Sequence, residues 1–229
     1  MFILSLSQNE MRKYVEQQLS MFFPDNNLIQ DKLFTKSFQM ALERTEYCFK
    51  YVELKAYNSD DSTFFSHLHA DQYTQFLWFL SNSVWNKYND KNLANKIFYL
   101  NKILNGFMCM YNTELPDIFL VLHGNGTVLG KAKYSNFFVC HHGCTVGAVH
   151  GTYPTFDKGV AMAPQSIVVG GCNIGNNVTI GTRALVRNKD IPNCSIFYQD
   201  TETGKTMIKS VQKYWAQSFF NVPITDGDK

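Results

Sequence analysis

An apolar residue recurs at every sixth position in one stretch of this 229-residue chain. The recurring residues are Met162, Val168, Ile174, Ile180 and Val186, and small or medium residues follow four positions after the first four of them, at Ser166, Cys172, Val178 and Ala184. A β-strand alternates with period two and an α-helix has 3.6 residues per turn, so neither explains this spacing. A period of six predicts a parallel β-helix, in which successive hexapeptides form the sides of a triangular prism around the apolar residues.

The repeat extends toward the N-terminus through Val146, Cys140, Tyr134 and Val128. Leu129 also has the form of a repeat start, which implies a one-residue shift before Cys140 and leaves the phase of that part open. The distance from Val146 to Met162 is not a multiple of six. Residues 148–158 are therefore predicted to leave the prism as an extruded loop, the kind of segment on which function is often carried.

The composition changes near Tyr111, which predicts two domains. Phe, Leu, Tyr, Asn and Lys are frequent before this point, and Gly and Val after it. Amphipathic patterns predict helices over residues 8–18, 32–57, 70–88 and 91–110, with a loop and helix cap at 58–62. The many aromatic residues of these helices are expected to pack in the core. The fold class is α+β, with a helical domain at 1–112, a β-helix at 113–197 and a C-terminal tail at 198–229.

The net charge of +2 is small and evenly spread, which argues against a nucleic-acid partner. No window holds the roughly 20 apolar residues that cross a bilayer, and the N-terminus lacks a basic leader, so we expect a cytoplasmic protein without a membrane span. The segment Cys-His-His-Gly-Cys at 140–144 contains zinc-ligand residue types. Cys140 and Cys144 fall on inward repeat positions, however, where a free thiol acts as a small hydrophobic group. No metal and no structural disulfide are expected.

Histidine is the side chain best suited to general base catalysis at neutral pH. Four histidines lie in or near the predicted β-helix, at His123, His141, His142 and His150. If Leu122 and Cys140 both start repeats, His123 and His141 lie one coil apart and face the same groove. His142 is one position further on, and His150 belongs to the extruded loop.

Several segments resemble the serine acetyltransferases of the hexapeptide-repeat acyltransferase superfamily. LHGNGTVLG at 122–130 is similar to the pattern D-H-A-T-G-I-V-V-G, and VCHHGCTVG at 139–147 to I-L-H-H-V-T-L-G. GTYPTFDKGVAM at 151–162 is similar to G-D-R-H-P-K-I-R-E-G-V-M-I, and residues 180–186 to I-G-A-G-S-V-V. In the helical half, HADQY at 69–73 and Leu77-Trp78 resemble F-H-A-L-Q-A-Y and H-W-L-W. The resemblance covers roughly residues 68–196.

This resemblance implies a left-handed β-helix, a homotrimer or a dimer of trimers, and acetyl-CoA as co-substrate. It implies that His123 is the general base, with His142 as the base instead if the one-residue shift moves the site. The acceptor pocket is expected to include His141, His150 and Tyr153. The acetyl-CoA groove is expected to include Ala163, Pro164, Gly181, Thr182 and Arg183.

Two departures from the family pattern concern the acceptor. Leu122 stands where the family has an Asp before the catalytic His, and Tyr153 stands where it has a second His. An ammonium group would lose its partner, and an unpaired buried charge is costly. We therefore expect a sugar hydroxyl, on a small saccharide or a surface polysaccharide, as the acceptor. A carboxylate at Asp60, Asp61 or Asp157 would restore the case for serine. N-acetylation of an amino sugar and a catalytically silent scaffold are also compatible with the sequence.

Overall fold

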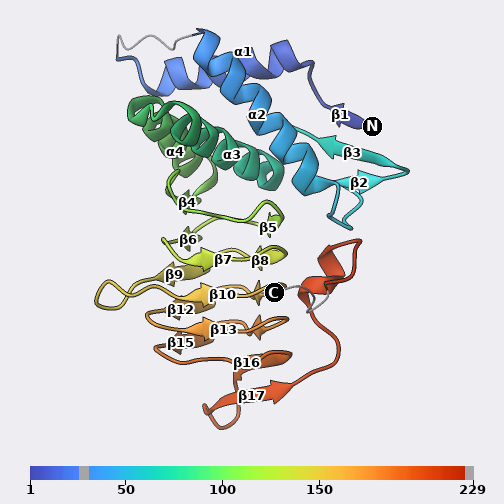
Figure 1. Ribbon diagram of the computed structural model, residues 1–229, viewed down its shortest axis with the longest axis vertical. Helices are drawn as coiled ribbons and strands as arrows, with labels where there is room; N and C mark the ends of the chain where they lie inside the picture. Colours follow the sequence, from blue (N-terminus) through green and yellow to red (C-terminus); the bar gives the residue numbers. More distant parts are fainter. Residues whose placement is uncertain (26–30, 225–229) are drawn as a thin grey trace.

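The computed structural model describes residues 1–25 and 31–224, and it places a helical part on top of a β-solenoid (Figure 1). The helices of the described chain are α1 (Gln8–Phe22), α2 (Asp31–Phe49), α3 (Ala70–Tyr88) and α4 (Lys91–Asn105). The α+β fold with an N-terminal helical part and a left-handed parallel β-helix is confirmed. No described helix has the length and apolar character needed to cross a membrane.

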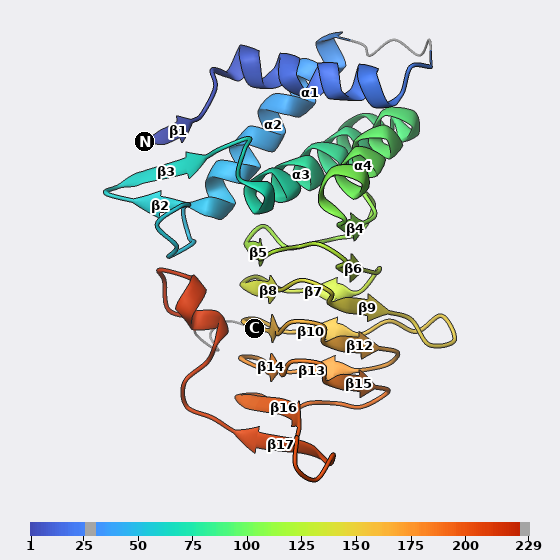
Figure 2. The same ribbon diagram turned by 180° about the vertical axis from the view of Figure 1, so that it is seen from behind.

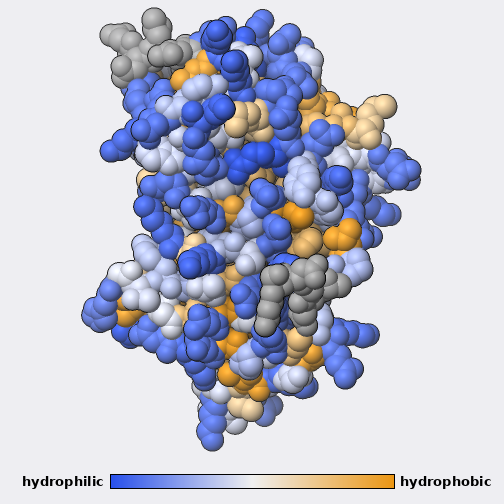
Figure 3. All heavy atoms as spheres, viewed as in Figure 1, coloured by the Kyte–Doolittle hydropathy of each residue, from blue (hydrophilic) through white to orange (hydrophobic). Residues whose placement is uncertain are grey.

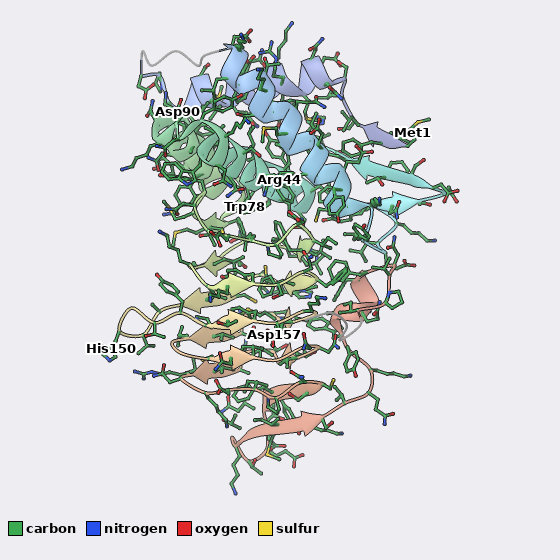
Figure 4. The ribbon with its side chains drawn as sticks, in the orientation of Figure 1. Met1, Arg44, Trp78, Asp90, His150 and Asp157 are labelled. Carbon is green, nitrogen blue, oxygen red and sulfur yellow. The ribbon has the colours of Figure 1, made fainter. Side chains whose placement is uncertain are left out.

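The helical part packs around α3, which is buried along almost its whole length. The aromatic residues expected in the core are there, with Phe76, Trp78 and Phe79 all at most 1% exposed. The Arg44 guanidinium lies over the rings of Phe79 and Trp78, at 4.7 and 5.5 Å from their centroids, where the helices meet the solenoid (Figure 4).

A small sheet at the N-terminus was not predicted. β2 (Asn58–Ser59) and β3 (Ser62–Phe65) form a hairpin, and β1 (Phe2–Leu4) pairs in parallel with β3. The expectation of a loop and helix cap at 58–62 is therefore wrong. Asp60 and Asp61 form the hairpin turn with φ of 49° and 59°, and the pairing with β1 joins segments too distant for a local pattern to reveal. The side chain of His69 caps α3 instead, accepting from Gln72 N at 3.5 Å.

The solenoid has three walls. The first wall contains β5 (Phe119–Val121), β8 (Phe138–Cys140), β11 (Ala161–Met162), β14 (Thr179–Ile180), β16 (Ser195–Gln199) and the antiparallel β17 (Thr206–Ser210). The second wall contains β4 (Met108–Cys109), β6 (Val128–Leu129), β9 (Thr145–Gly147), β12 (Ile167–Val169) and β15 (Leu185–Arg187). The third wall contains β7 (Lys133–Tyr134), β10 (Thr155–Phe156) and β13 (Asn173–Ile174). Since β4 belongs to the second wall, the solenoid starts slightly before residue 113.

The six-residue spacing of inward side chains is confirmed. Met162, Val168, Ile174, Ile180 and Val186 are each at most 1% exposed. Cys140 and Cys144 are also fully buried. Figure 3 shows that hydrophilic residues cover most of the face seen in Figure 1, with hydrophobic residues in a vertical strip over the solenoid.

The register of the first coil differs from the simplest prediction. Val121 pairs with Cys140 and Leu129 with Val146, so Leu129 rather than Val128 is the inward residue. The longer turn after β5 absorbs the extra residues. Because Leu122 N donates to Cys140 O, the counterpart of His141 is Leu122, and the expected stacking of His123 on His141 is wrong.

The extruded loop is shorter than predicted, because residues 155 and 156 form β10 in the third wall. At the other end of the chain, residues 211–224 form what we call the C-terminal strap, which includes a 3₁₀ helix (Ala216–Phe219). Figures 1 and 2 show the strap in red, rising from β17 beside the first wall toward the helical part. The final residues of the predicted tail, 225–229, lie outside the described residues.

Candidate active site

Three histidines meet at the edge between the first and second walls, which we call the histidine corner. His123 lies in the turn that joins β5 to β6, and His141 and His142 lie in the turn that joins β8 to β9. Repulsion from His123 and His142 contributes to a lowered pKa of His141, which reflects their proximity. The structure thus brings together three of the four histidines singled out in the sequence.

His123 projects into solvent with a buried carboxylate behind it. Its side chain is 77% exposed, and its Nδ1 lies 3.6 Å from Oδ2 of Asp71, whose side chain is only 11% exposed. Asp71 belongs to the first turn of α3. With Nδ1 directed at a carboxylate, the other ring nitrogen of His123 is free to face a substrate.

The glycine after His123 packs tightly against the preceding strand. A Cβ on Gly124 would lie 2.6 Å from Cγ1 of Val121, and 3.8 Å, an ordinary van der Waals distance, from Cγ2 of Thr74 on α3. A side chain at this position would require Val121 or the turn to shift. His123 itself has a φ of 53°, in the left-handed region.

Asp71 was not among the carboxylates considered from the sequence. Asp60 and Asp61 form the β2–β3 turn instead, and Asp157 follows β10 at the edge between the third and first walls (Figure 4). A signal was nevertheless present, because Asp71 stands at a leucine of the family pattern F-H-A-L-Q-A-Y. A charged residue in place of a leucine on a helix packed against the β-helix marks a buried charge that needs a partner.

The C-terminal strap packs against His141, which is partly buried. Its ring stacks on Trp215 with centroids 4.8 Å apart and planes 7° apart, and Phe219 meets it edge-on at 5.9 Å. Its Nε2 is buried and has no hydrogen-bond partner in the described part of the chain. Burial, followed by repulsion from His123 and His142, lowers the pKa of His141 to about 4 against a weaker opposing effect of Asp71.

A groove of about 650 Å³ runs down from the histidine corner. It is lined by His142, Pro164, Gln165, Thr182, Arg183, Gln199, Asp200, Thr201 and Gly204. Pro164, Thr182 and Arg183 therefore lie together, and the β16–β17 hairpin forms the opposite side. Ala163 and Gly181 adjoin the groove without lining it, because Gly181 packs against β16, where an added Cβ would come within 2.9 Å of Tyr198 Cβ.

The remaining two predicted site residues lie elsewhere in this chain. His150 and Tyr153 belong to the extruded loop, which joins β9 of the second wall to β10 of the third (Figure 4). His150 is exposed, and Tyr153 packs near Gly130. A single chain does not bring them to the histidine corner.

Comparison with solved structures places this architecture among known folds. A soybean serine acetyltransferase apoenzyme is similar over 90% of this chain and 84% of its own, with a TM-score of 0.68 and 15% identity. A serine acetyltransferase from Brucella abortus strain S19 in complex with coenzyme A matches over 92% and 84%, with a TM-score of 0.67 and 14% identity. The fold is that of the serine acetyltransferases.

A third serine acetyltransferase, isoform 3 from Entamoeba histolytica in complex with cysteine, covers 88% of this chain and 74% of its own, with a TM-score of 0.60 and 16% identity. No protein-family model and no curated protein sequence matches the chain. The similarity to serine acetyltransferases is thus carried by the arrangement of helices and solenoid far more than by residue identity.

Proposed function

We propose that this protein is an O-acetyltransferase that uses acetyl-CoA. The observation that carries the proposal is the exposed imidazole of His123, backed by the buried carboxylate of Asp71 and standing above the groove. A base oriented by a carboxylate is the arrangement that proton abstraction from a hydroxyl requires. Solved structures with this fold include serine acetyltransferases in complex with coenzyme A, which supports the proposal.

In the proposed reaction, Nε2 of His123 removes the proton of the acceptor hydroxyl as the oxygen attacks the thioester carbonyl. The C–S bond then breaks, and the imidazolium returns its proton to the coenzyme A thiolate. Asp71 stabilises the imidazolium between these steps. Its separation from Nδ1 exceeds a hydrogen bond, and such contacts commonly tighten when substrate is bound.

The groove below His142 is the proposed site of acetyl-CoA. Its volume lies in the range of small-molecule pockets, and Arg183 supplies a cation at its edge for a phosphate. Nε of Arg183 donates to Gln165 Oε1 at 2.9 Å, which fixes the guanidinium along the groove. Backbone groups near Ala163 and Gly181 are proposed to position the pantetheine arm.

A homotrimer would complete the site. Because His150 and Tyr153 lie on an edge other than the histidine corner, they reach an acceptor bound at His123 only if a second copy supplies them. The helical parts of two trimers would be free to associate into a dimer of trimers.

We also propose that the enzyme acts in the cytoplasm.

The favoured acceptor is a sugar hydroxyl. Leu122 is buried and uncharged, so the position next to His123 offers an ammonium group no partner, and Tyr153 offers a ring and one hydroxyl. Serine is the second candidate. Asp71 supports it, because this carboxylate reaches the corner from α3 and supplies the negative charge that Leu122 lacks.

An acceptor screen tests the proposal. Purified protein is incubated with acetyl-CoA and L-serine, neutral sugars, an oligosaccharide or glucosamine, and free thiol is measured. Faster release with sugars supports the sugar acceptor, whereas efficient O-acetylserine formation selects serine. If a calorimetric titration shows no coenzyme A binding, the proposed activity is wrong and the protein is a catalytically silent scaffold.

A further inference from the structure

The C-terminal strap connects the far end of the solenoid to the helical part and passes the histidine corner on its way. At its start, Val211 N donates to Cys194 O at 2.8 Å. At its end, Glu53 N donates to Phe219 O at 2.9 Å and Asn221 N to Tyr51 O at 3.0 Å. The strap is thus fixed on both sides of Trp215.

Trp215 and Phe219 form an aromatic clamp on His141. Their own rings meet at 5.6 Å and 62°, and both contact the imidazole. The flat stack of Trp215 covers one face of the ring, and Nε2 is left buried without a partner among the described residues. The clamp therefore determines both where His141 lies and what its nitrogen atoms can reach.

This environment opposes the cationic form of His141. Both ring nitrogens of a protonated imidazole are donors, and the buried Nε2 has no acceptor among the described residues. The indole face attracts a cation, but the loss of hydration is the larger effect, in agreement with the lowered pKa of His141.

The charge of His141 matters because of its neighbours. The titratable groups that face it are His123, His142 and Asp71. In the proposed reaction His123 becomes an imidazolium, and a second cation beside it would oppose that step and compete for Asp71. A neutral His141 leaves the carboxylate to His123.

We propose that Trp215 is a positioning residue that clamps His141 in the histidine corner and reserves proton uptake for His123. The role in catalysis rests on the proposed function, whereas the clamp itself does not. Trp215 acts through His141, on whose ring it stacks.

Side-chain NMR tests the clamp without any activity measurement. In the full-length protein, the ring resonance of His141 is assigned with His141→Gln. Its chemical shift is expected to stay constant from about pH 8 to about pH 5.5. In Trp215→Ala the same resonance is expected to titrate near the ordinary histidine value of about 6.5. Trp215→Phe restores the flat response, and Lys213→Ala, an exposed change in the same strap, leaves it unaltered. A flat response in Trp215→Ala overturns the proposal.

The pH profile of kcat/KM then tests the consequence for catalysis. Trp215→Ala is expected to match the unmodified protein at about pH 8, where His141 is neutral in both, and to give a profile of different shape below about pH 6.5, where His141 becomes a cation beside His123. Trp215→Phe should restore the kcat/KM values of the unmodified protein at acidic pH. An equal loss at every pH indicates a purely structural role and contradicts the proposal. If His141 titrates in Trp215→Ala but the unmodified protein transfers no acetyl group, the proposed function is contradicted and the clamp is still supported.

Discussion

The side-chain oxygen of Gln75 accepts a hydrogen bond from the backbone N–H of Val121 at 2.9 Å. The amide nitrogen of Gln75 donates to Phe119 O at 3.1 Å, so one side chain pairs with the open edge of β5 as a neighbouring strand would. Gln75 follows Asp71 by one turn of α3, and Val121 precedes His123 by two residues. The helix that closes the solenoid thus also delivers the carboxylate to the histidine.

Gln75→Leu should destabilise the protein by about 1–3 kcal/mol, because it leaves the buried Val121 N–H without a partner, while Phe119 O keeps only the weak donor of the Cys48 thiol. Urea unfolding monitored by circular dichroism measures this change. Gln17→Leu, on the exposed side of α1, is the matched control and should stay within about 0.5 kcal/mol. Equal stability of the two variants would show that Gln75 does not hold the junction.

His123→Ala should reduce acetyl transfer by about 10²–10⁴-fold while coenzyme A binding remains nearly unchanged, since a general base acts in the transition state. Asp71→Asn, which keeps the shape and removes the charge, should also lower kcat far more than it raises KM. His142→Ala and His150→Ala are expected to be milder. If His142→Ala is inactive and His123→Ala nearly active, the base is His142.

Thr182→Trp should fill the groove and weaken coenzyme A binding by at least about tenfold, which corresponds to about 1.4 kcal/mol. Isothermal titration calorimetry gives the affinity directly. Lys133→Trp, on the exposed surface of the third wall, is the control that should bind normally. Unchanged affinity in Thr182→Trp would place coenzyme A outside this groove.

Stability should fall on acidification partly through His141. Its pKa in the folded protein is about 4, below the value of about 6.5 in an unfolded chain, so the unfolded state binds more protons between these values. This contribution is complete above about pH 6.5 and is lost as the pH falls toward about 4. His141→Phe keeps a ring in the clamp and should lose less stability between about pH 7.5 and about pH 5 than the unmodified protein. His150→Phe, in the exposed loop, should show the unmodified loss, and identical losses in all three proteins would contradict the assignment.

Sedimentation should show a trimer or a multiple of it at micromolar protein concentration. If neighbouring copies share the site, co-refolding of inactive His123→Ala with Tyr153→Ala should regenerate some sites that hold both native residues, and activity should rise above the sum of the separate variants. A monomer would remove the shared site.

The solenoid could be predicted from the sequence because its signal is local and repeated. Met162, Val168 and Ile174 meet the same environment in successive walls, so selection for a buried side chain recurs at a fixed spacing. The groove residues Pro164, Thr182 and Arg183 were expected from the family resemblance, and the repeat explains why they lie together, because the chain returns to the same edge one coil later.

The partners of the histidines could not be predicted in this way. Asp71 and Trp215 approach the corner from α3 and from the strap, and neither distance along the chain is encoded in the repeat. The register before Cys140 also depended on a longer turn after β5, whose extra residues are accommodated by Gly124 and Gly126. Long-range packing decided each of these features.

The strap also links its own length to the number of coils in the solenoid. It is anchored to the solenoid at Cys194 and to the helical part at Tyr51, and the chain between Val211 and Asn221 joins these anchors past His141. A solenoid lengthened or shortened by one coil would pull Trp215 out of line with His141 or leave the strap slack. Repeat proteins usually tolerate such changes because each repeat contacts only its neighbours. In this chain the gain or loss of a coil would also change the distance that the strap has to cover.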